Sequence, residues 1–310
     1  MIIDDEKIES PICEYNFPFP GKHIIYFLFD IKNITNLSYL FYLVQYMTLI
    51  YFTCLFDTKN IENMAYMFYY CINLESIDLS NFNTQNVKYM GGMFSCCFNL
   101  LSIDLSNFDT RNLEEAYYIF SNCYELESIN ISHFNTQKLE YIFGMFDGCK
   151  NLISVYLPNF NNKINTYLHY LFNGCSKLKS IDLSVFNTFN TQNILNMEYM
   201  FQGCSSLEYI DLSNFNAQKL IFMNNMFSNC YKLKSIDLFK YNRQTPLYMN
   251  NTFTNCSQLN FINISSFISN SIELNNTFNN ISSTGTIIIN KILFDKINNS
   301  LYNWTIVAND

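Results

Sequence analysis

Cysteine is the first residue type in this sequence that suggests chemistry, because eight of the eleven cysteines recur at a nearly constant spacing. Thiolates bind zinc and pair as disulfides. No CxxC pair or histidine cluster supplies the ligand spacing of a zinc site. In a continuous column of stacked cysteines, each thiol can form a disulfide with only one of its two neighbours, so only every second pair of neighbours could be bridged. We therefore expect reduced, buried thiols that pack as small apolar groups, with no metal and no cofactor. The eight are Cys71, Cys97, Cys123, Cys149, Cys175, Cys204, Cys230 and Cys256. Cys13 and Cys54 lie outside this series.

Aspartate recurs at a second position with the same spacing. The residues are Asp78, Asp104, Asp182, Asp211 and Asp237. On neighbouring strands about 4.8 Å apart, two carboxylates repel by roughly 1 kcal/mol in water. A cation or a basic ligand would relieve that repulsion, and a solvated column of charges is the alternative interpretation. A hydrolase is not expected here, because paired catalytic carboxylates need a cleft and one raised pKa.

Histidines and short motifs indicate no catalytic site. His23, His133 and His169 have no serine, cysteine or carboxylate at a recognisable motif spacing. His133 stands where other copies of the pattern have asparagine, such as Asn81, so we expect a role in a turn. No GxGxxG, P-loop, HExxH or GxSxG stretch occurs. We predict a protein that is not an enzyme and has no catalytic residues.

Composition narrows the class of partner. Charged residues make up 14% and apolar residues 49% of the chain, which predicts a folded protein despite the net charge of -8. Lysine and arginine are scattered, so nucleic acid is not an expected partner. The amino terminus lacks a basic region followed by an apolar run, which indicates a cytoplasmic protein.

These recurring positions belong to a 26-residue repeat. From Met67 the chain reads MFYYCINLESIDLSNFNTQNVKYMGG, then MFSCCFNLLSIDLSNFDTRNLEEAYY. Leu74, Ile77 and Leu79 alternate with polar residues, as in a half-buried strand. The segment from Val87 to Cys97 carries apolar residues at helical spacing. The sequence therefore predicts an α/β repeat solenoid, a horseshoe with one parallel β-sheet on the concave side and short helices on the convex side.

The repeat sets the expected domain boundaries: an N-terminal cap over 1–22, about ten repeats over 23–282, and a C-terminal cap over 283–310. Residues Leu37 to Phe56 hold no charge over 20 residues, long enough for a membrane span. However, residues 33–41 match 60–68 at an offset of 27. A degenerate first pair of repeats is therefore the preferred interpretation, with a membrane span as the alternative.

The run MFxxCxxLxSIDLSNFNT resembles the BspA-like leucine-rich-repeat surface proteins of bacteria and protists. The likeness covers roughly residues 24 to 290, and the segments TGTIIIN and NWTIV look like the carboxyl-terminal cap of that family. The resemblance implies a horseshoe-like solenoid with a binding or adhesion role at the cell surface. It supplies no catalytic residues.

The predicted function is recognition of a protein or a glycan through the concave repeat surface. Aromatic residues interrupt the serine and aspartate pattern there and are favoured interface anchors. The candidate ligand-binding residues are Asp78, Asp104, Tyr156, Asp182, Tyr209, Asp211, Asp237 and Phe261. An intracellular scaffold for protein–protein interaction, with no adhesive role, is the alternative function.

Overall fold

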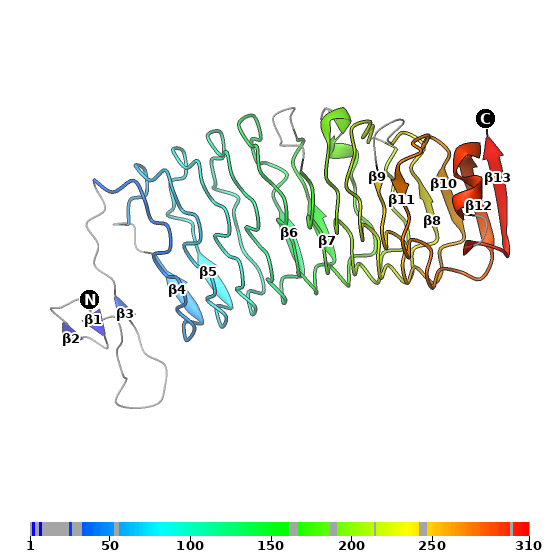
Figure 1. The fold of residues 1–310 in the computed structure, drawn as a ribbon. Helices are drawn as coiled ribbons and strands as arrows, with labels where there is room; N and C mark the ends of the chain where they lie inside the picture. The colour runs from blue at the N-terminus through cyan, green and yellow to red at the C-terminus, as the bar shows by residue number, and fades with distance from the viewer. Residues whose placement is uncertain are drawn as a thin grey trace.

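The computed structural model describes residues 2–3, 6–7, 25–26, 33–52, 56–160, 167–186, 191–213, 215–241, 247–297 and 300–309. Residues 33–309 form an elongated parallel β-solenoid, in which successive turns of the chain stack side by side (Figure 1). This confirms the predicted repeat solenoid. Most of the predicted N-terminal cap lies outside the described residues, and so do His23, Cys13 and Cys54.

Short strands line one side of the stack, which we call the strand face. Its strands are β4 (Leu49–Tyr51), β5 (Ser76–Asp78), β6 (Ser128–Asn130), β7 (Ser154–Tyr156), β8 (Ser235–Asp237), β10 (Phe261–Ile264), β12 (Gly285–Asn290) and β13 (Trp304–Asn309). Neighbouring strands pair in parallel with each residue beside its copy in the next turn, as Ile50 beside Ile77. In β5 and β6 the central isoleucine is buried and its neighbours are exposed, as the alternation predicted.

The remaining elements are also short. They are the antiparallel strands β1 (Ile2–Ile3), β2 (Glu6–Lys7) and β3 (Ile25–Tyr26), the parallel pair β9 (Leu247–Tyr248) and β11 (Ile272–Glu273), the 3₁₀ segments η1 (Ser184–Phe186), η2 (Thr191–Asn193) and η3 (Lys291–Leu293), and the helix α1 (Phe294–Ile297). In the part of the chain that the structure describes, no helix is long and apolar enough to cross a membrane.

The predicted repeat helices are wrong, because the segment equivalent to Val87–Cys97 forms turns in each described copy. From Met90 to Cys96, every second amide bonds to a carbonyl of the next turn, and amides between them bond to carbonyls three residues back, not four as in an α-helix. Met64 and Phe68, for example, donate to the carbonyls of Tyr89 and Met93 at 2.8 and 2.9 Å. Isolated parallel bridges such as Tyr89 to Glu115 form a second column opposite the strands. We call this side the turn face.

Positive φ angles explain why the turn face is not helical. Two residues in each turn, four apart, have φ between +50° and +75°, a conformation that interrupts a right-handed helix. The second position carries Gly148, Gly174, Gly203, Asn229, Asn255 and Asn280 in the later turns. Glycine and asparagine are the residues that adopt this conformation most readily. The helical spacing of apolar residues therefore arises from a different backbone path.

The first positive-φ position alternates tyrosine and glycine over several turns. It holds Tyr66, Gly92, Tyr118, Gly144 and Tyr170. A β-carbon added at Gly92 would overlap the ring of Tyr66, and one added at Gly144 would overlap the ring of Tyr118. Each of these two glycines therefore leaves space for the tyrosine ring of the preceding turn.

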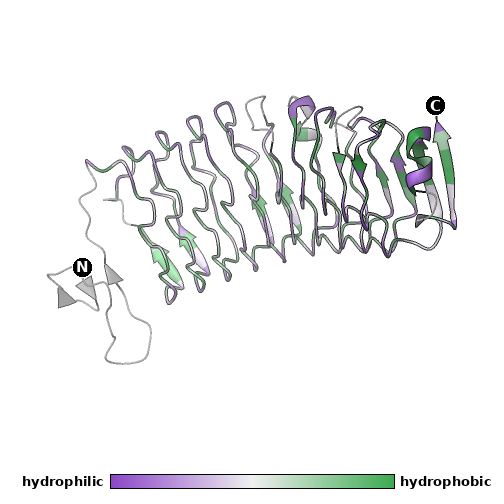
Figure 2. Ribbon diagram, viewed as in Figure 1, coloured by the Kyte–Doolittle hydropathy of each residue, from purple (hydrophilic) through white to green (hydrophobic). Residues whose placement is uncertain are grey.

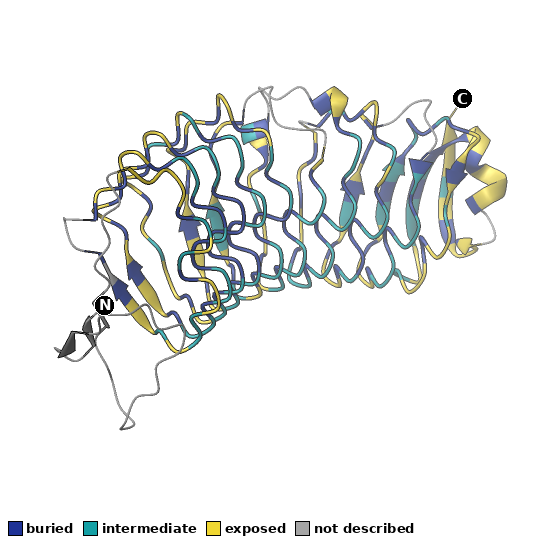
Figure 3. Cartoon of the chain, turned by 60° about the vertical axis from the view of Figure 1, so that its left-hand side comes forward, coloured by how far each residue is buried: buried dark blue, intermediate teal, exposed yellow. Residues whose placement is uncertain are grey.

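Columns of identical side chains fill the core. Phe146 is fully buried and stacks on Phe120 and Phe172 of the adjacent turns, with ring centroids 5.9 and 5.4 Å apart. The same stacking continues from Phe41 to Phe278. Hydrophobic and hydrophilic segments alternate around every turn (Figure 2), and buried segments alternate with exposed ones in the same way (Figure 3). No single turn could bury its apolar side alone, so stacking supplies the core.

The eight repeated cysteines form a hydrogen-bonded column beside these rings. Each thiol donates to the carbonyl of a phenylalanine in the preceding turn at 3.0 to 3.2 Å, as Cys149 does to Phe120. All eight are free and buried, as predicted. Burial raises the pKa of Cys71, Cys204 and Cys256 to about 12. The reactive thiolate is therefore strongly disfavoured.

We expect this column to resist alkylation in the folded protein. Iodoacetamide at pH 8, followed by peptide mass mapping, should modify the partly exposed Cys96 while the eight column cysteines stay unmodified, because attack requires an accessible thiolate. Unfolding in guanidinium chloride is the control and should make all of them react. A column cysteine that reacts as fast as Cys96 before unfolding would contradict the arrangement.

Both ends of the described solenoid extend the repeat. Leu37, Phe41, Ile50 and Phe52 are buried in the core, and Phe41 stacks on Phe68, which supports the degenerate-repeat interpretation of this stretch. At the other end, the segment TGTIIIN contributes β12. Trp304–Asn309 forms β13, which continues the sheet in parallel after η3 and α1.

Candidate binding site on the strand face

The recurrent aspartates have a local structural role on the strand face. Each accepts a hydrogen bond through Oδ1 from the amide two residues later. Asp78 accepts from Ser80 at 2.9 Å, Asp211 from Ser213 at 2.8 Å and Asp237 from Phe239 at 2.9 Å. This is an Asx turn, which bends the chain away from the strand. Asn130 and Asn263 make the same bond to Ser132 and Ser265, so the carboxylate is not required for the turn.

These hydrogen bonds also stabilise the charged form of the carboxylates. The amide of the serine two residues on, with its hydroxyl, lowers the pKa of Asp78, Asp104 and Asp211, and Lys240 lowers that of Asp211 further. For Asp182, the hydroxyl of Ser184 lowers the pKa first and its amide second. These four side chains are exposed and ionised at neutral pH, so they give the strand face a column of negative charge.

Tyr156 occupies the aspartate position in the turn where no Asx bond could form. Two residues later stands Pro158, which has no amide hydrogen to donate. The tyrosine side chain is 60% exposed. Its presence therefore costs the turn nothing and adds an aromatic ring to the strand face.

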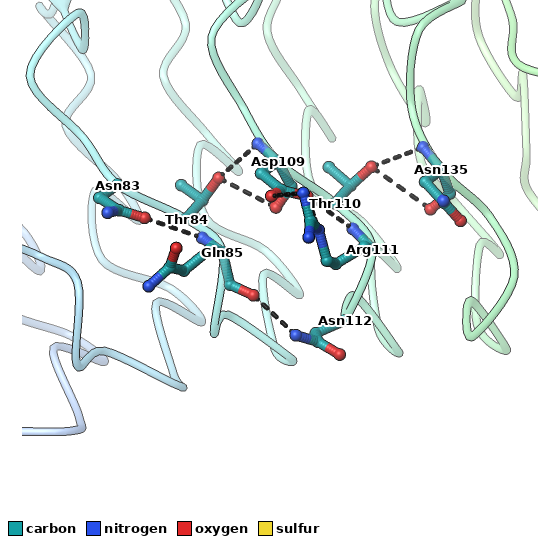
Figure 4. Close-up of polar contacts among 8 residues, drawn as sticks. All are labelled: Asn83, Thr84, Gln85, Asp109, Thr110, Arg111, Asn112 and Asn135. Atoms are coloured by element: carbon teal, nitrogen blue, oxygen red, sulfur yellow. Dashed lines mark hydrogen bonds and ion pairs between the residues drawn. The ribbon is translucent and has the colours of Figure 1, made fainter.

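The corner after each strand holds the turns in register. The Thr84 hydroxyl accepts a hydrogen bond from the Asp109 amide at 2.8 Å and donates to the Asp109 carbonyl at 3.1 Å (Figure 4). Thr110 makes the same pair of bonds to Asn135. These bonds join neighbouring turns of the solenoid.

His133 takes over the role of the corner asparagine. Asn107 donates to the Leu79 carbonyl of the preceding turn at 3.0 Å, and His133 Nε2 contacts the equivalent Leu105 carbonyl at the same distance. This agrees with the predicted turn role. His169 lies on the turn face, where its ring stacks on Phe143 with centroids 4.7 Å apart and burial lowers its pKa.

A hollow of about 260 Å³ opens on the strand face between three neighbouring turns. It brings together four of the predicted site residues: Tyr209, Asp211, Asp237 and Phe261. The other four, Asp78, Asp104, Tyr156 and Asp182, do not line it. Half of the predicted site residues therefore line the hollow, but the sequence gave no indication of the hollow itself.

Seven lining residues were not predicted, and the two of them that depart from the repeat are Phe239 and Lys240. Phe239 is 52% exposed, and the Lys240 ammonium donates to the Ser213 carbonyl at 2.6 Å. A signal was present in the repeat, because the sequence Phe-Lys-Tyr over 239–241 replaces the usual Ser-Asn-Phe. For locating the hollow, the departure from the repeat at three consecutive positions was thus a better signal than the recurrent aspartates.

Within the described residues, no group of three or more histidine, cysteine, aspartate or glutamate side chains is arranged to hold a metal ion. Beside the hollow, Lys234 and Glu208 form an ion pair across adjacent turns at 3.0 Å. Both side chains are largely exposed, so the pair contributes little stability.

Comparison with known proteins gives a family match along most of the chain. The family model described as "Mycoplasma protein of unknown function, DUF285" matches residues 26–128, 117–190 and 166–291. No curated protein matches.

Several solved structures are similar at low identity. A leucine-rich repeat protein from Bacteroides ovatus has 21% identity and a TM-score of 0.40, covering 81% of this chain and 71% of that chain. A leucine-rich cell surface protein from Faecalibacterium prausnitzii has 19% identity and a TM-score of 0.30, covering 72% and 77%. An internalin from Listeria monocytogenes has 14% identity and a TM-score of 0.25, covering 78% and 69%.

Proposed function

The chain belongs to the family described as Mycoplasma protein of unknown function, DUF285, and we propose that it is a non-catalytic repeat module that binds a polypeptide along its strand face. The observation that carries this proposal is the exposure of large aromatic rings on a face otherwise built from serine and aspartate. Tyr156 and Tyr209 are each 60% exposed, and Phe239 is 52% exposed. Aromatic anchors of this kind dominate the energetics of protein interfaces.

The regularity of the strand face suits an extended ligand. Its outward positions recur once per turn, so a polypeptide lying across the turns meets the aromatic rings of Tyr156 and Tyr209 in sequence. The fixed hydrogen bonds of the corners and the stacked core hold these positions rigidly, which reduces the entropy lost on binding. The ionised aspartates favour recognition over acid catalysis, because a general acid needs a raised pKa.

Adhesion at the cell surface is the finer form of this proposal, and the resemblance of the repeat to BspA-like proteins supports it. The intracellular scaffold remains the alternative, and both forms require the same polypeptide-binding face. Cellular location separates them, because an adhesin must be accessible from outside the cell.

Selection from a displayed library of random 12-residue peptides tests the binding proposal on the full chain. Recovered peptides should bind the wild-type protein at least tenfold more tightly than the variant Tyr156→Ala/Tyr209→Ala/Asp211→Asn, since aromatic truncation at an interface costs more than about 1 kcal/mol per anchor. The matched control is Tyr46→Ala, which removes a 93% exposed tyrosine outside the strand face.

Unfolding curves of the triple variant should match wild type, because the three side chains are exposed and asparagine preserves the Asx turn. Peptides that bind the triple variant as well as wild type would move the site off the strand face. Recovery of no peptide, with neutral glycans bound instead and lost in the triple variant, would overturn the polypeptide proposal.

A further inference from the structure

The hollow between the turns of Tyr209, Asp237 and Phe261 has the size of a single side chain. Its volume of about 260 Å³ lies below the roughly 300 to 1,000 Å³ of pockets that enclose whole small-molecule ligands. It opens on the face where we propose that a polypeptide lies. A protruding side chain of that polypeptide is therefore the occupant that fits its size and position.

The charges that line the hollow indicate which kind of side chain would bind in it. Asp211 and Asp237 stand at the same strand position in adjacent turns, about 4.8 Å apart along the sheet. Each uses Oδ1 to accept an amide hydrogen bond from its own turn. A carboxylate has about four acceptor sites, so each retains capacity for a ligand. Lys240 is the only cation among the lining residues, and its ammonium is engaged by the Ser213 carbonyl.

Aromatic rings complete the lining. Tyr209, Phe239 and Phe261 come from three successive turns and all border the hollow. Ring faces attract cations, and the planar guanidinium of arginine stacks on them while its edge donates hydrogen bonds. Two carboxylates on adjacent turns match the several N–H donors of one guanidinium better than they match the compact ammonium of lysine.

From this geometry we infer that the hollow binds an arginine side chain of the polypeptide partner, with the guanidinium bridging Asp211 and Asp237 and lying against the ring of Tyr209 or Phe261. The inference rests on the proposed function, because it names the residue that anchors the polypeptide. It adds a chemical preference that the exposure of the rings alone does not require.

Peptides recovered by the display selection supply the probe. We expect them to share an arginine. Replacing that arginine with citrulline, its uncharged analogue of similar shape, should weaken binding to the full chain roughly tenfold or more, as measured by fluorescence anisotropy. The variant Asp211→Asn/Asp237→Asn should weaken the arginine peptide by a similar factor and the citrulline peptide little.

The control variant is Asp78→Asn/Asp104→Asn, which removes two carboxylates of the same local geometry away from the hollow. It should leave the affinity within about twofold of wild type at 0.15 M salt, where charges beyond about 8 Å are screened. All four changes preserve the Asx turn, as Asn130 and Asn263 demonstrate.

The outcomes separate this inference from the proposed function. Peptides that lose affinity for Tyr156→Ala/Tyr209→Ala/Asp211→Asn but contain no common arginine, or bind Asp211→Asn/Asp237→Asn normally, overturn the arginine assignment and leave the polypeptide-binding face intact. Equal weakening by Asp78→Asn/Asp104→Asn would reduce the effect to general charge attraction and also overturn it. Binding that no strand-face variant alters overturns both.

Discussion

Replacing Phe146 with alanine is expected to lower the free energy of unfolding by about 3 to 5 kcal/mol, the cost of a large cavity in a packed core. Its ring is fully buried between Phe120 and Phe172, so truncation removes contacts with both neighbouring turns at once. Urea denaturation followed by circular dichroism measures the loss. An m value, the slope of the free energy of unfolding against urea concentration, equal to that of wild type would show that the variant still folds to the same compact state.

Lys150→Ala is the matched control four residues away. The Lys150 side chain is exposed and its ammonium lies 3.9 Å from the centroid of the Tyr124 ring. Losing that exposed cation–π contact should cost only about 0.5 to 1 kcal/mol. Equal costs for the two variants would show that the phenylalanine column is not the core.

Replacing Gly144 with alanine is expected to lower the free energy of unfolding by about 2 to 5 kcal/mol. Its φ of +62° penalises any residue with a β-carbon by about 1 to 2 kcal/mol. The new methyl group would also overlap the Tyr118 ring of the preceding turn, and such overpacking typically adds about 1 to 3 kcal/mol. The same urea measurement applies.

Gly203→Ala separates these two contributions. Gly203 has a similar φ of +70°, but its added β-carbon would meet only the backbone of Gly174, at 3.5 Å. We expect it to cost only the backbone strain, about 1 to 2 kcal/mol. If the two alanine variants are equally stable, the Tyr118 ring moves aside freely and the alternation of tyrosine and glycine has no packing role.

The sequence predicted the columns better than it predicted the backbone between them. Side-chain burial at Phe146, Cys149 and Leu152 follows directly from a repeated apolar position, whatever the local conformation. The helix prediction failed because spacing alone does not reveal a positive φ. The glycines and asparagines at the second positive-φ position, such as Gly148 and Asn229, were the available signal.

For the candidate site, too, the sequence predicted repeated positions but not the local structure that depends on several turns. Repetition located the outward position that Asp211 and Asp237 share, because that depends only on strand alternation. It could not indicate that Tyr209 and Phe261 border a common hollow with Phe239, since that depends on the size of side chains in three separate turns. The Asx role of the aspartates was missed, although a serine two residues later was visible in most copies.

The repeat that contains Phe186 is three residues longer than its neighbours, which shows how the solenoid changes length. The ring of Phe186 stacks between Phe160 and Phe215, and Thr191 keeps its bond to the Asn216 amide, so the extra residues lie between Phe186 and Thr191. The thiol of Cys204 still reaches the Phe172 carbonyl, now 32 residues away instead of 29. The phenylalanine and cysteine columns therefore keep their register across the longer repeat.

The cysteine and threonine columns have an evolutionary consequence. Turns that carry the same thiol, hydroxyl and aromatic ring present compatible surfaces even when they come from different places in the stack, whereas the turn with Ala217 at the threonine position lacks the hydroxyl. Recombination between near-identical gene segments that adds or removes a whole 26-residue copy creates a junction with the same hydrogen bonds as before. Chain length can thus diverge between relatives by duplication or loss of copies, while the outward positions are free to vary independently of the columns.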